Sequence, residues 1–338
     1  MSFGVNYPGE ATDRTERVRK ARLAMRTDYS RAPRRPKATS KPVAPPFSYY
    51  GAKQRLASQI VAMLPPHNAW VEAFCGSAAL TLAKPSAPIE VINDLNGHIV
   101  TVFRQLRTNA QELCKAVALT PYAAEEFEDS HCSNGKLTSL ETARRFLVRT
   151  MMTVNGTVDG TRSGFSFSQS YAREHREARV NRWYNLPQRL DEIVNRLRNV
   201  RVEKRDARDI LRMFSDRPAT LVYLDPPYFT KREHGYVIDA NDRAFHAELL
   251  EICRKARCMI LLSGYDNDLY QEMLIDAGGW KKKRIETHTR DTTGKDYPRT
   301  EVLWMNERFT SAKKLGRVPI RLSKKERHDN KINPPRLR

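Results

Sequence analysis

The sequence is poor in cysteine, and its few cysteines show none of the spacings that build metal sites or disulfide frameworks. There are five, an odd number, and no two form a C-x-x-C pair. This argues against zinc-binding and disulfide-rich classes and favours a reducing cytoplasm. The eight histidines show no H-x-x-H or H-E-x-x-H spacing, so we expect no metal site.

Long apolar runs are missing as well. No stretch of 18 apolar residues occurs, which argues against a membrane-spanning helix and a membrane partner. The first residues are polar and charged, so we expect no signal peptide. The pattern G-x-x-x-x-G-K-[ST] is also absent, which argues against ATP held by a P-loop.

Basic residues are abundant and are concentrated at the two ends. The 338-residue chain has 59 Lys and Arg against 39 Asp and Glu, a net charge of +20. Residues 1–45 hold 11 basic and 4 acidic side chains, and residues 308–338 hold 11 and 2. Such ends can simply aid solubility, but we favour a nucleic acid or another polyanion as partner.

Strand-like and helix-like segments alternate between residues 46 and 307. This order predicts an α/β domain built on a parallel sheet with right-handed crossovers. The last two strand-like segments, 282–287 and 301–306, predict an antiparallel closing pair. The other predicted strands are 69–74, 89–94, 200–203, 221–224 and 258–263, and the predicted helices are 55–64, 79–83, 96–118 and 242–257.

A helical, arginine-rich segment interrupts this alternation at residues 119–198. We interpret it as a second domain inserted into the α/β domain. The predicted organisation is therefore a basic, disordered arm (1–45), an α/β domain in two parts (46–118 and 199–307), the insert (119–198) and a basic tail (308–338).

The first strand-to-helix turn has small residues where a ligand can approach the backbone. Gly76, Ser77 and Ala78 follow the strand at 69–74, and the next strand ends at Asp94. In α/β nucleoside-binding folds an acid at this position binds ribose hydroxyls. Two structural alternatives stay open, an ordinary βα turn for the glycine and a helix N-cap for Asp94.

A more specific signal follows the strand at 221–224. Asp225-Pro226-Pro227-Tyr228 ends that strand with an acid, two residues without a backbone N–H and an aromatic ring. The prolines keep the chain stiff and leave their carbonyls free to accept hydrogen bonds. An ordinary turn is the structural alternative.

With these motifs the sequence resembles the Dam-like (alpha-order) DNA adenine-N6 methyltransferases over roughly residues 46–306. The resemblance implies a Rossmann-like class I methyltransferase sheet with an inserted, mostly helical DNA-recognition domain. It also implies S-adenosylmethionine as cofactor, S-adenosylhomocysteine as product, no metal, and double-stranded DNA as partner. "PFSYYGAKQRLASQI", "VEAFCGSAAL", "INDLN", "EKRDARDIL" and "RTEVLWMN" carry it.

Carried over residue by residue, the resemblance implies a cofactor site and a target-base pocket. Ala78 departs from it, because the family usually has a second glycine there. The helix and strand at 245–267 would line the base pocket near Ser263 and Tyr265. The implied cofactor residues are Tyr50, Lys53, Phe74, Gly76, Ser77, Asp94, Asp206 and Asp225.

The resemblance also gives the Asp225–Tyr228 segment a chemical role. The adenine amino group is a poor nucleophile because its lone pair is conjugated with the ring. Asp225 and the Pro226 carbonyl can accept its two N–H bonds and free that lone pair, with Pro227 holding the segment rigid. Tyr228 would stack on a base that has left the duplex. A cytosine-C5 enzyme would need a Pro-Cys nucleophile, and no such dipeptide occurs.

The arginines of the insert fit phosphates and guanine edges, and we expect them to contact DNA. A solvated helical face is the alternative. Met151-Met152 and Trp183-Tyr184 could contact DNA too, but core packing is the favoured interpretation. The arginines assigned to DNA are Arg144, Arg145, Arg149, Arg162, Arg173 and Arg176.

The expected activity is site-specific methylation of adenine N6 in DNA, in a bacterial cytoplasm, by a nucleoid-associated or phage-encoded protein. An RNA adenine-N6 methyltransferase and a catalytically silent DNA-binding protein of this fold are the alternatives. A protein glutamine methyltransferase usually has Asn where this chain has Asp225. The recognition sequence, and association with a restriction nuclease, stay open.

Overall fold

The computed structural model describes residues 42–49, 51, 53–132, 135–154, 164–167, 172–173, 175–228, 243–290 and 296–318. The chain divides into two units, residues 1–39 and 40–338, and all described residues belong to the second. Tyr50, Arg162 and most of the two predicted basic ends lie outside the described residues.

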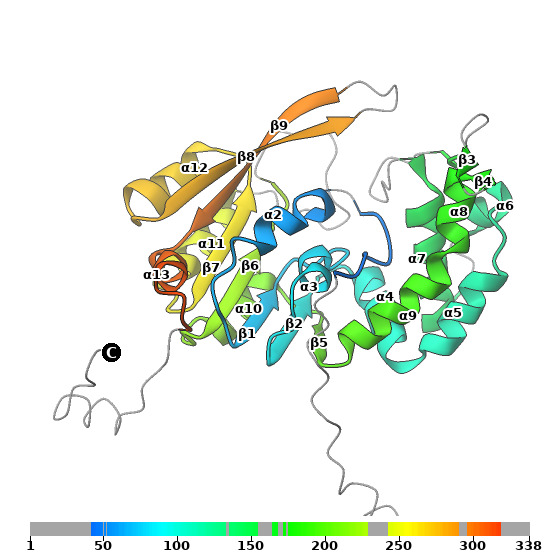
Figure 1. The fold of residues 1–338 in the computed structure, drawn as a ribbon, viewed down its shortest axis with the longest axis horizontal. Coiled ribbons are helices and arrows are strands. Elements are labelled where there is room, and N and C mark those ends of the chain that lie inside the picture. The colour runs from blue at the N-terminus through cyan, green and yellow to red at the C-terminus, as the bar shows by residue number, and fades with distance from the viewer. Residues whose placement is uncertain are drawn as a thin grey trace, which may run out of the picture. The chain divides into compact units, whose positions relative to one another are not determined.

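A seven-stranded mixed sheet forms the centre of the fold, in the order β5-β2-β1-β6-β7-β9-β8 (Figure 1). The first five strands in that order are parallel, and β9 pairs antiparallel with both β7 and β8. This confirms the predicted α/β class and its closing hairpin. The strands are β1 (Ala69–Glu72), β2 (Ile89–Asn93), β5 (Val200–Glu203), β6 (Thr220–Leu224), β7 (Met259–Gly264), β8 (Lys281–Arg290) and β9 (Asp296–Met305), and a separate pair joins β3 (Ala172–Arg173) to β4 (Arg176–Glu177).

Helices precede, connect and follow these strands. Those beside the sheet are η2 (Lys53–Arg55), α2 (Ala57–Val61), α3 (Ala79–Ala83), α10 (Ala207–Phe214), α11 (Arg243–Lys255), α12 (Asp268–Tyr270) with the π-helical η4 (Gln271–Asp276), and α13 (Glu307–Leu315). The remainder are α4 (Gly97–Thr108), α5 (Ala110–Leu119), α6 (Ala124–Asp129), α7 (Ser139–Met152), α8 (Ala178–Tyr184) and α9 (Leu186–Leu197).

The helical run predicted over 96–118 is confirmed, and the chain divides it into two helices, α4 and α5. Asn109 leaves the helical conformation, with φ −149° and ψ 42°, and it both ends α4 and begins α5. Asparagine favours helix ends because its side chain competes for backbone hydrogen bonds. The apolar periodicity continues across the break, which is why the pattern alone does not reveal it.

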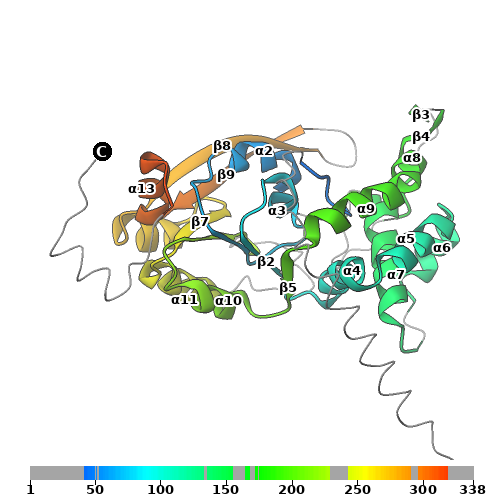
Figure 2. The same cartoon turned by 60° about the horizontal axis from the view of Figure 1, so that its bottom comes forward.

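The central strands are buried on both faces, as their continuous apolar sequences require. Along β6, Val222 and Leu224 join a core with α10, α11 and α12, whereas Leu221 and Tyr223 join a second core with α2 and α13. This alternation follows from the two-residue period of a strand. Figure 2 shows α10 and α11 on one side of the sheet and α2 and α3 on the other.

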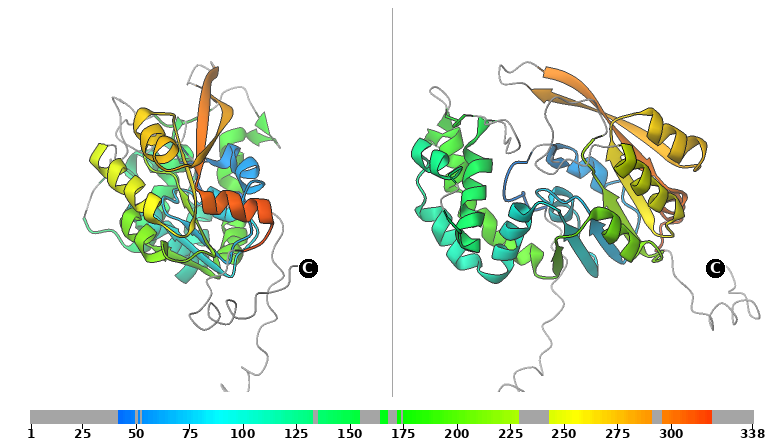
Figure 3. Two further views of the ribbon diagram at one scale, coloured as in Figure 1. Left: turned by 90° about the vertical axis from the view of Figure 1, so that its left-hand side faces the viewer. Right: turned by 180° about the vertical axis from the view of Figure 1, so that it is seen from behind.

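The helices from α4 to α9 gather beside the sheet around a third core (Figure 3). Helix α4 packs against α7, and α5 packs against α9. The predicted division at 118/119 falls at the end of α5, yet α4 and α5 share this core with the helices of the predicted insert. The domain boundaries stay a prediction.

A buried cluster of charges fastens α9 to the sheet. Arg196 of α9 and Lys84 both pair with Glu90 of β2, Lys84 Nζ at 2.7 Å and Arg196 Nη2 at 2.9 Å from Oε1. Arg196 also donates to the Thr81 carbonyl, at 2.6 Å. Burial alone would raise the pKa of Glu90, but its hydrogen bonds to Arg196 and the charge of Lys84 outweigh burial and lower it.

Candidate active site

The carboxyl ends of four adjacent parallel strands meet at one pocket. Ligands of open α/β sheets bind at this edge. The pocket includes the residues that follow β1, β2, β5 and β6. Of the predicted cofactor and catalytic residues, those that line it are Lys53, Phe74, Gly76, Ser77, Asp94, Asp206, Asp225 and Pro227.

The turn after β1 depends on two residues with left-handed backbone. Gly76 has φ +48°, and a Cβ there would lie 3.2 Å from Cδ1 of the Tyr49 ring. Ala78 has φ +55° and is fully buried. Glycine is the usual residue at this position of the resembled family because an L-residue in this conformation costs about 1–2 kcal/mol. Ala78 adopts the left-handed conformation here although it has a Cβ.

Asp94 holds this turn in place. Its Oδ2 accepts the Gly76 N–H at 2.8 Å, and its Oδ1 accepts the Asn96 N–H at 2.9 Å. Asn96 is the N-cap of α4, because its side chain accepts the His98 N–H. The alternative interpretation of Asp94 as the helix N-cap is therefore wrong, and Asp94 remains on the pocket wall.

Asp206 lies at the start of α10, and its carboxylate accepts hydrogen bonds from Arg208. It is the N-cap, and Oδ1 accepts the Arg208 N–H at 2.8 Å. The Arg208 guanidinium donates to Oδ2 at 2.7 Å. These hydrogen bonds lower the pKa of Asp206, so the pocket keeps an anionic acceptor here.

Asp225 is part of a buried network that reaches three strands. Lys53 Nζ lies 2.8 Å from both of its carboxylate oxygens, and Ser263 Oγ donates to Oδ1 at 2.9 Å. Lys53 also donates to the Tyr228 oxygen and lies 3.5 Å from Glu301 Oε1. Tyr228 in turn donates to Glu301 Oε1 at 2.6 Å. The predicted cofactor residue Lys53 thus contacts the predicted catalytic segment directly.

Burial and charge act in opposite directions on this network. Burial alone would lower the pKa of Lys53, but the carboxylates of Asp225 and Glu301 raise it. For Glu301, burial raises the pKa more than the Lys53 ammonium lowers it. Lys53 therefore stays protonated and is shared by two acids.

Two tyrosines that are predicted to contact the target base, Tyr228 and Tyr265, lie against each other. Tyr228 is 8% exposed, and its ring meets that of Tyr265 edge to face, with 4.5 Å between centroids. Pro226 is buried beside it in the chain. Among the described residues of the pocket wall, the four-residue segment contributes Asp225 and Pro227. Stacking of Tyr228 on a base stays a prediction.

Glu72 and Glu301 were missed from the sequence. Glu72 lines the pocket at 3% exposure and accepts hydrogen bonds from the Thr81 N–H, at 2.9 Å, and from the Thr81 hydroxyl. Burial raises its pKa to about 7. A signal was present, because each glutamate directly borders an apolar run, "AWV" before Glu72 and "VLWM" after Glu301.

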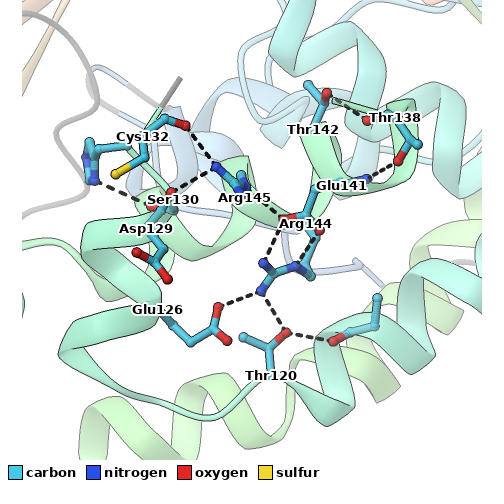
Figure 4. A network of polar contacts seen from close by, with 12 residues as sticks. Thr120, Glu126, Asp129, Ser130, Cys132, Thr138, Glu141, Thr142, Arg144 and Arg145 are labelled. Atoms are coloured by element: carbon cyan, nitrogen blue, oxygen red, sulfur yellow. Dashed lines mark hydrogen bonds and ion pairs between the residues drawn. The ribbon is translucent and has the colours of Figure 1, made fainter. Parts of the chain in front are cut away.

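Three of the arginines assigned to DNA are bound to other parts of the helical region, and Figure 4 shows two of them, Arg144 and Arg145. Arg144 pairs with Glu141 at 2.7 Å and with Glu126 at 2.8 Å. Arg145 pairs with Glu141 at 2.7 Å and donates to two carbonyls, and Arg149 donates to the Ser130 carbonyl. The hydrogen bonds from Arg144 and Arg145 lower the pKa of Glu141 to about 2. These contacts join α7 to α6, and the DNA role of the three stays a prediction.

The other insert residues differ in exposure. Arg176 is exposed, with its guanidinium 4.1 Å from the centroid of the Tyr184 ring, and Arg173 lies on β3. Trp183, like Met151 and Met152, is buried, which confirms the core-packing interpretation for these three. Tyr184 is 61% exposed, so that interpretation is wrong for it.

Within the described ranges, no group of three or more His, Cys, Asp and Glu side chains is arranged to hold a metal ion. Across the same ranges, no helix has both the length and the apolar character needed to span a bilayer.

Comparisons with known proteins agree on the chemistry. Residues 49–288 match the family described as D12 class N6 adenine-specific DNA methyltransferase. The type II methyltransferase M1.LlaDCHI of Lactococcus lactis subsp. cremoris is 26% identical over 261 residues, which is 72% of this chain and 89% of the relative.

Solved structures give weaker likenesses. Precorrin 8W decarboxylase of Methanobacterium thermoautotrophicum is 11% identical with a TM-score of 0.32, over 80% of this chain and 97% of that one. The rRNA methyltransferase aviRa of Streptomyces viridochromogenes is 16% identical with a TM-score of 0.30, over 82% and 90%. Scores of this size carry no conclusion about the chain.

Proposed function

Because the chain belongs to the D12 class of N6 adenine-specific DNA methyltransferases, which use S-adenosylmethionine, we propose that it methylates an adenine rotated out of double-stranded DNA at a specific site. The observation that carries this proposal is that Gly76 and Asp225 line the same pocket. The glycine turn after β1 and the Asp225–Tyr228 segment are therefore neighbours, although almost 150 residues separate Gly76 from Asp225 in the chain.

The pocket residues fit S-adenosylmethionine, which supplies a methyl group bound to a sulfonium. Gly76 and Ser77 of the turn line the pocket, and Phe74 and Phe245 offer apolar walls for a purine. Asp94 would accept ribose hydroxyls, and Asp206 would accept the amino group of the cofactor's adenine. Lys53 would border the same site, and S-adenosylhomocysteine would leave from it.

Asp225 and the Pro226 carbonyl would accept the two N–H bonds of the target amino group. That contact draws the nitrogen lone pair out of conjugation, and a rigid segment lets it form without reorganisation. The Tyr228 and Tyr265 rings would hold the everted base. Transfer then depends on alignment more than on a proton acceptor, and we assign no metal to it.

The DNA contacts would come from the basic residues of the helical region, chiefly the exposed Arg176, and from the basic ends of the chain. We place the activity in the bacterial cytoplasm. A role beside a restriction nuclease would match the type II name of the relative. Methylation-sensitive sequencing of DNA from expressing cells would give the recognition site.

Transfer of labelled methyl groups from S-adenosylmethionine tests the proposal. Unmodified duplex DNA should be the best substrate, with single strands and RNA accepted less well. Preference for RNA would favour an RNA adenine methyltransferase. Absence of transfer to any of the three, with intact cofactor binding, would favour a catalytically silent DNA-binding protein.

A further inference from the structure

Glu301 is a buried carboxylate to which the proposed reaction gives no role. It lies on β9, opposite Ile285 of β8, and is 5% exposed. Its Oε1 is 3.5 Å from Lys53 Nζ and 2.6 Å from the Tyr228 hydroxyl. Burying a carboxylate costs free energy unless it is paired, so its place beside the catalytic segment calls for a function.

The geometry around Asp225 identifies a difficulty that Glu301 can resolve. Lys53 Nζ lies 2.8 Å from both Asp225 oxygens, and Ser263 uses Oδ1 as well. A carboxylate oxygen accepts about two hydrogen bonds, so Oδ1 is filled and one position on Oδ2 is left for a substrate amino group. The ammonium also reduces the negative charge that makes Asp225 a strong acceptor.

Glu301 offers the same ammonium a second partner. Lys53 already points toward it, since Lys53 Nζ also donates to the Tyr228 oxygen and Tyr228 donates to Glu301. The Lys53 ammonium is 4.9 Å from the Tyr228 ring centroid. A movement of about 1 Å would replace the contact to Asp225 by a full ion pair with Glu301, on the hydrogen-bond distances usual for such pairs.

We propose that Glu301 is a positioning residue that takes over the Lys53 ammonium when the target amino group arrives, so that Asp225 can accept an N–H bond from adenine. This inference rests on the proposed function, because it assigns Asp225 to the substrate amino group. Lys53 remains charged throughout, and only its partner changes.

The test is a Glu301→Gln variant assayed for methyl transfer to duplex DNA. Glutamine keeps the volume and an oxygen acceptor for Tyr228 but loses the negative charge. We expect kcat to fall about tenfold, the scale of coupling within one charged network. The melting temperature and the Kd for S-adenosylmethionine should stay close to those of the wild type. Glu301→Asp, which restores the charge, should recover part of the lost kcat.

The matched control is Glu286→Gln, which removes an exposed carboxylate from the same hairpin and should leave kcat unchanged. A double-mutant cycle identifies the route. In a Lys53→Met background, Glu301→Gln should have almost no further effect, whereas in a Tyr228→Phe background its effect should persist.

Three outcomes would overturn the inference. They are wild-type kcat in Glu301→Gln, an undiminished effect in the Lys53→Met background, and loss of the effect in the Tyr228→Phe background. In each of these cases the wild type still transfers methyl groups, so the proposed function stands. A wild type that transfers none rejects the proposed function and this inference with it.

Discussion

Replacing Glu72 by glutamine should change how the stability of the protein depends on pH. Burial raises the pKa of this carboxyl from 4.5 to about 7, so the folded protein binds its proton more tightly than the unfolded chain does. Between those two pKa values the unfolded state holds fewer protons. The free energy of unfolding therefore falls as pH rises through this window and levels off above it.

The size of the effect follows from the same two values. At 1.36 kcal/mol per pH unit, a pKa raised from 4.5 to about 7 costs the wild type about 3 kcal/mol once Glu72 is fully ionised. Glu72→Gln does not titrate and escapes this loss. The variant should therefore gain stability relative to the wild type by roughly 2–3 kcal/mol between pH 5 and pH 8.

Urea unfolding of both proteins without cofactor, at pH 5 and at pH 8, measures this difference. His67 titrates in part of the same window with the opposite slope, since burial lowers its pKa to about 4. It is present in both proteins and cancels from the comparison. A stability difference that is equal at the two pH values would refute the reasoning, whatever its constant offset.

The remaining predictions concern three acids. Asp225→Ala should lower the rate of methyl transfer to DNA by at least about a hundredfold, as the loss of one oriented transition-state contact does. Calorimetry should find the affinity for the cofactor nearly unchanged. Near-normal turnover would contradict the role of Asp225. Asp94→Asn should raise the Kd for S-adenosylmethionine about tenfold, because the Gly76 N–H loses a charged acceptor. An equal rise of this Kd in the control variant Asp209→Asn, which changes an exposed acid, would show the effect to be unspecific. Glu90→Gln should cost about 3–5 kcal/mol in urea unfolding, since it leaves the buried Lys84 and Arg196 without their anion; a loss below about 1 kcal/mol would speak against the cluster as an anchor.

Much of the sheet and the pocket wall could be predicted because the signals are local. Strand β6 has five consecutive buried residues followed at once by Asp225 and two prolines, and the structure ends it at Leu224. Asp94 likewise follows β2 directly, and Asp206 comes three residues after the end of β5. In a parallel sheet, residues after adjacent strands share one edge, so these acids meet in one pocket.

The contacts between distant segments could not be predicted in the same way. Lys53 and Asp225 are 172 residues apart, and their pairing depends on η2 lying beside the end of β6. The arginines of α7 have the composition of a DNA-binding surface, yet Glu126 and Glu141 are placed to bind Arg144. The composition gives the number of arginines, but the packing of the helices decides which of them pair with acids of the same chain.

The helices from α4 to α9 leave the sheet after β2 and return to it at β5, and these two strands are paired, with Asn93 opposite Glu203. The chain returns at Val200, opposite Glu90, so the two junctions lie on neighbouring strands but at opposite ends of them. If these helices read DNA as proposed, the helical region of another methyltransferase could replace them between β2 and β5 without altering the order of the strands. The inserted helices would need an arginine at the position of Arg196, so that they pair with Glu90 of β2 as α9 does.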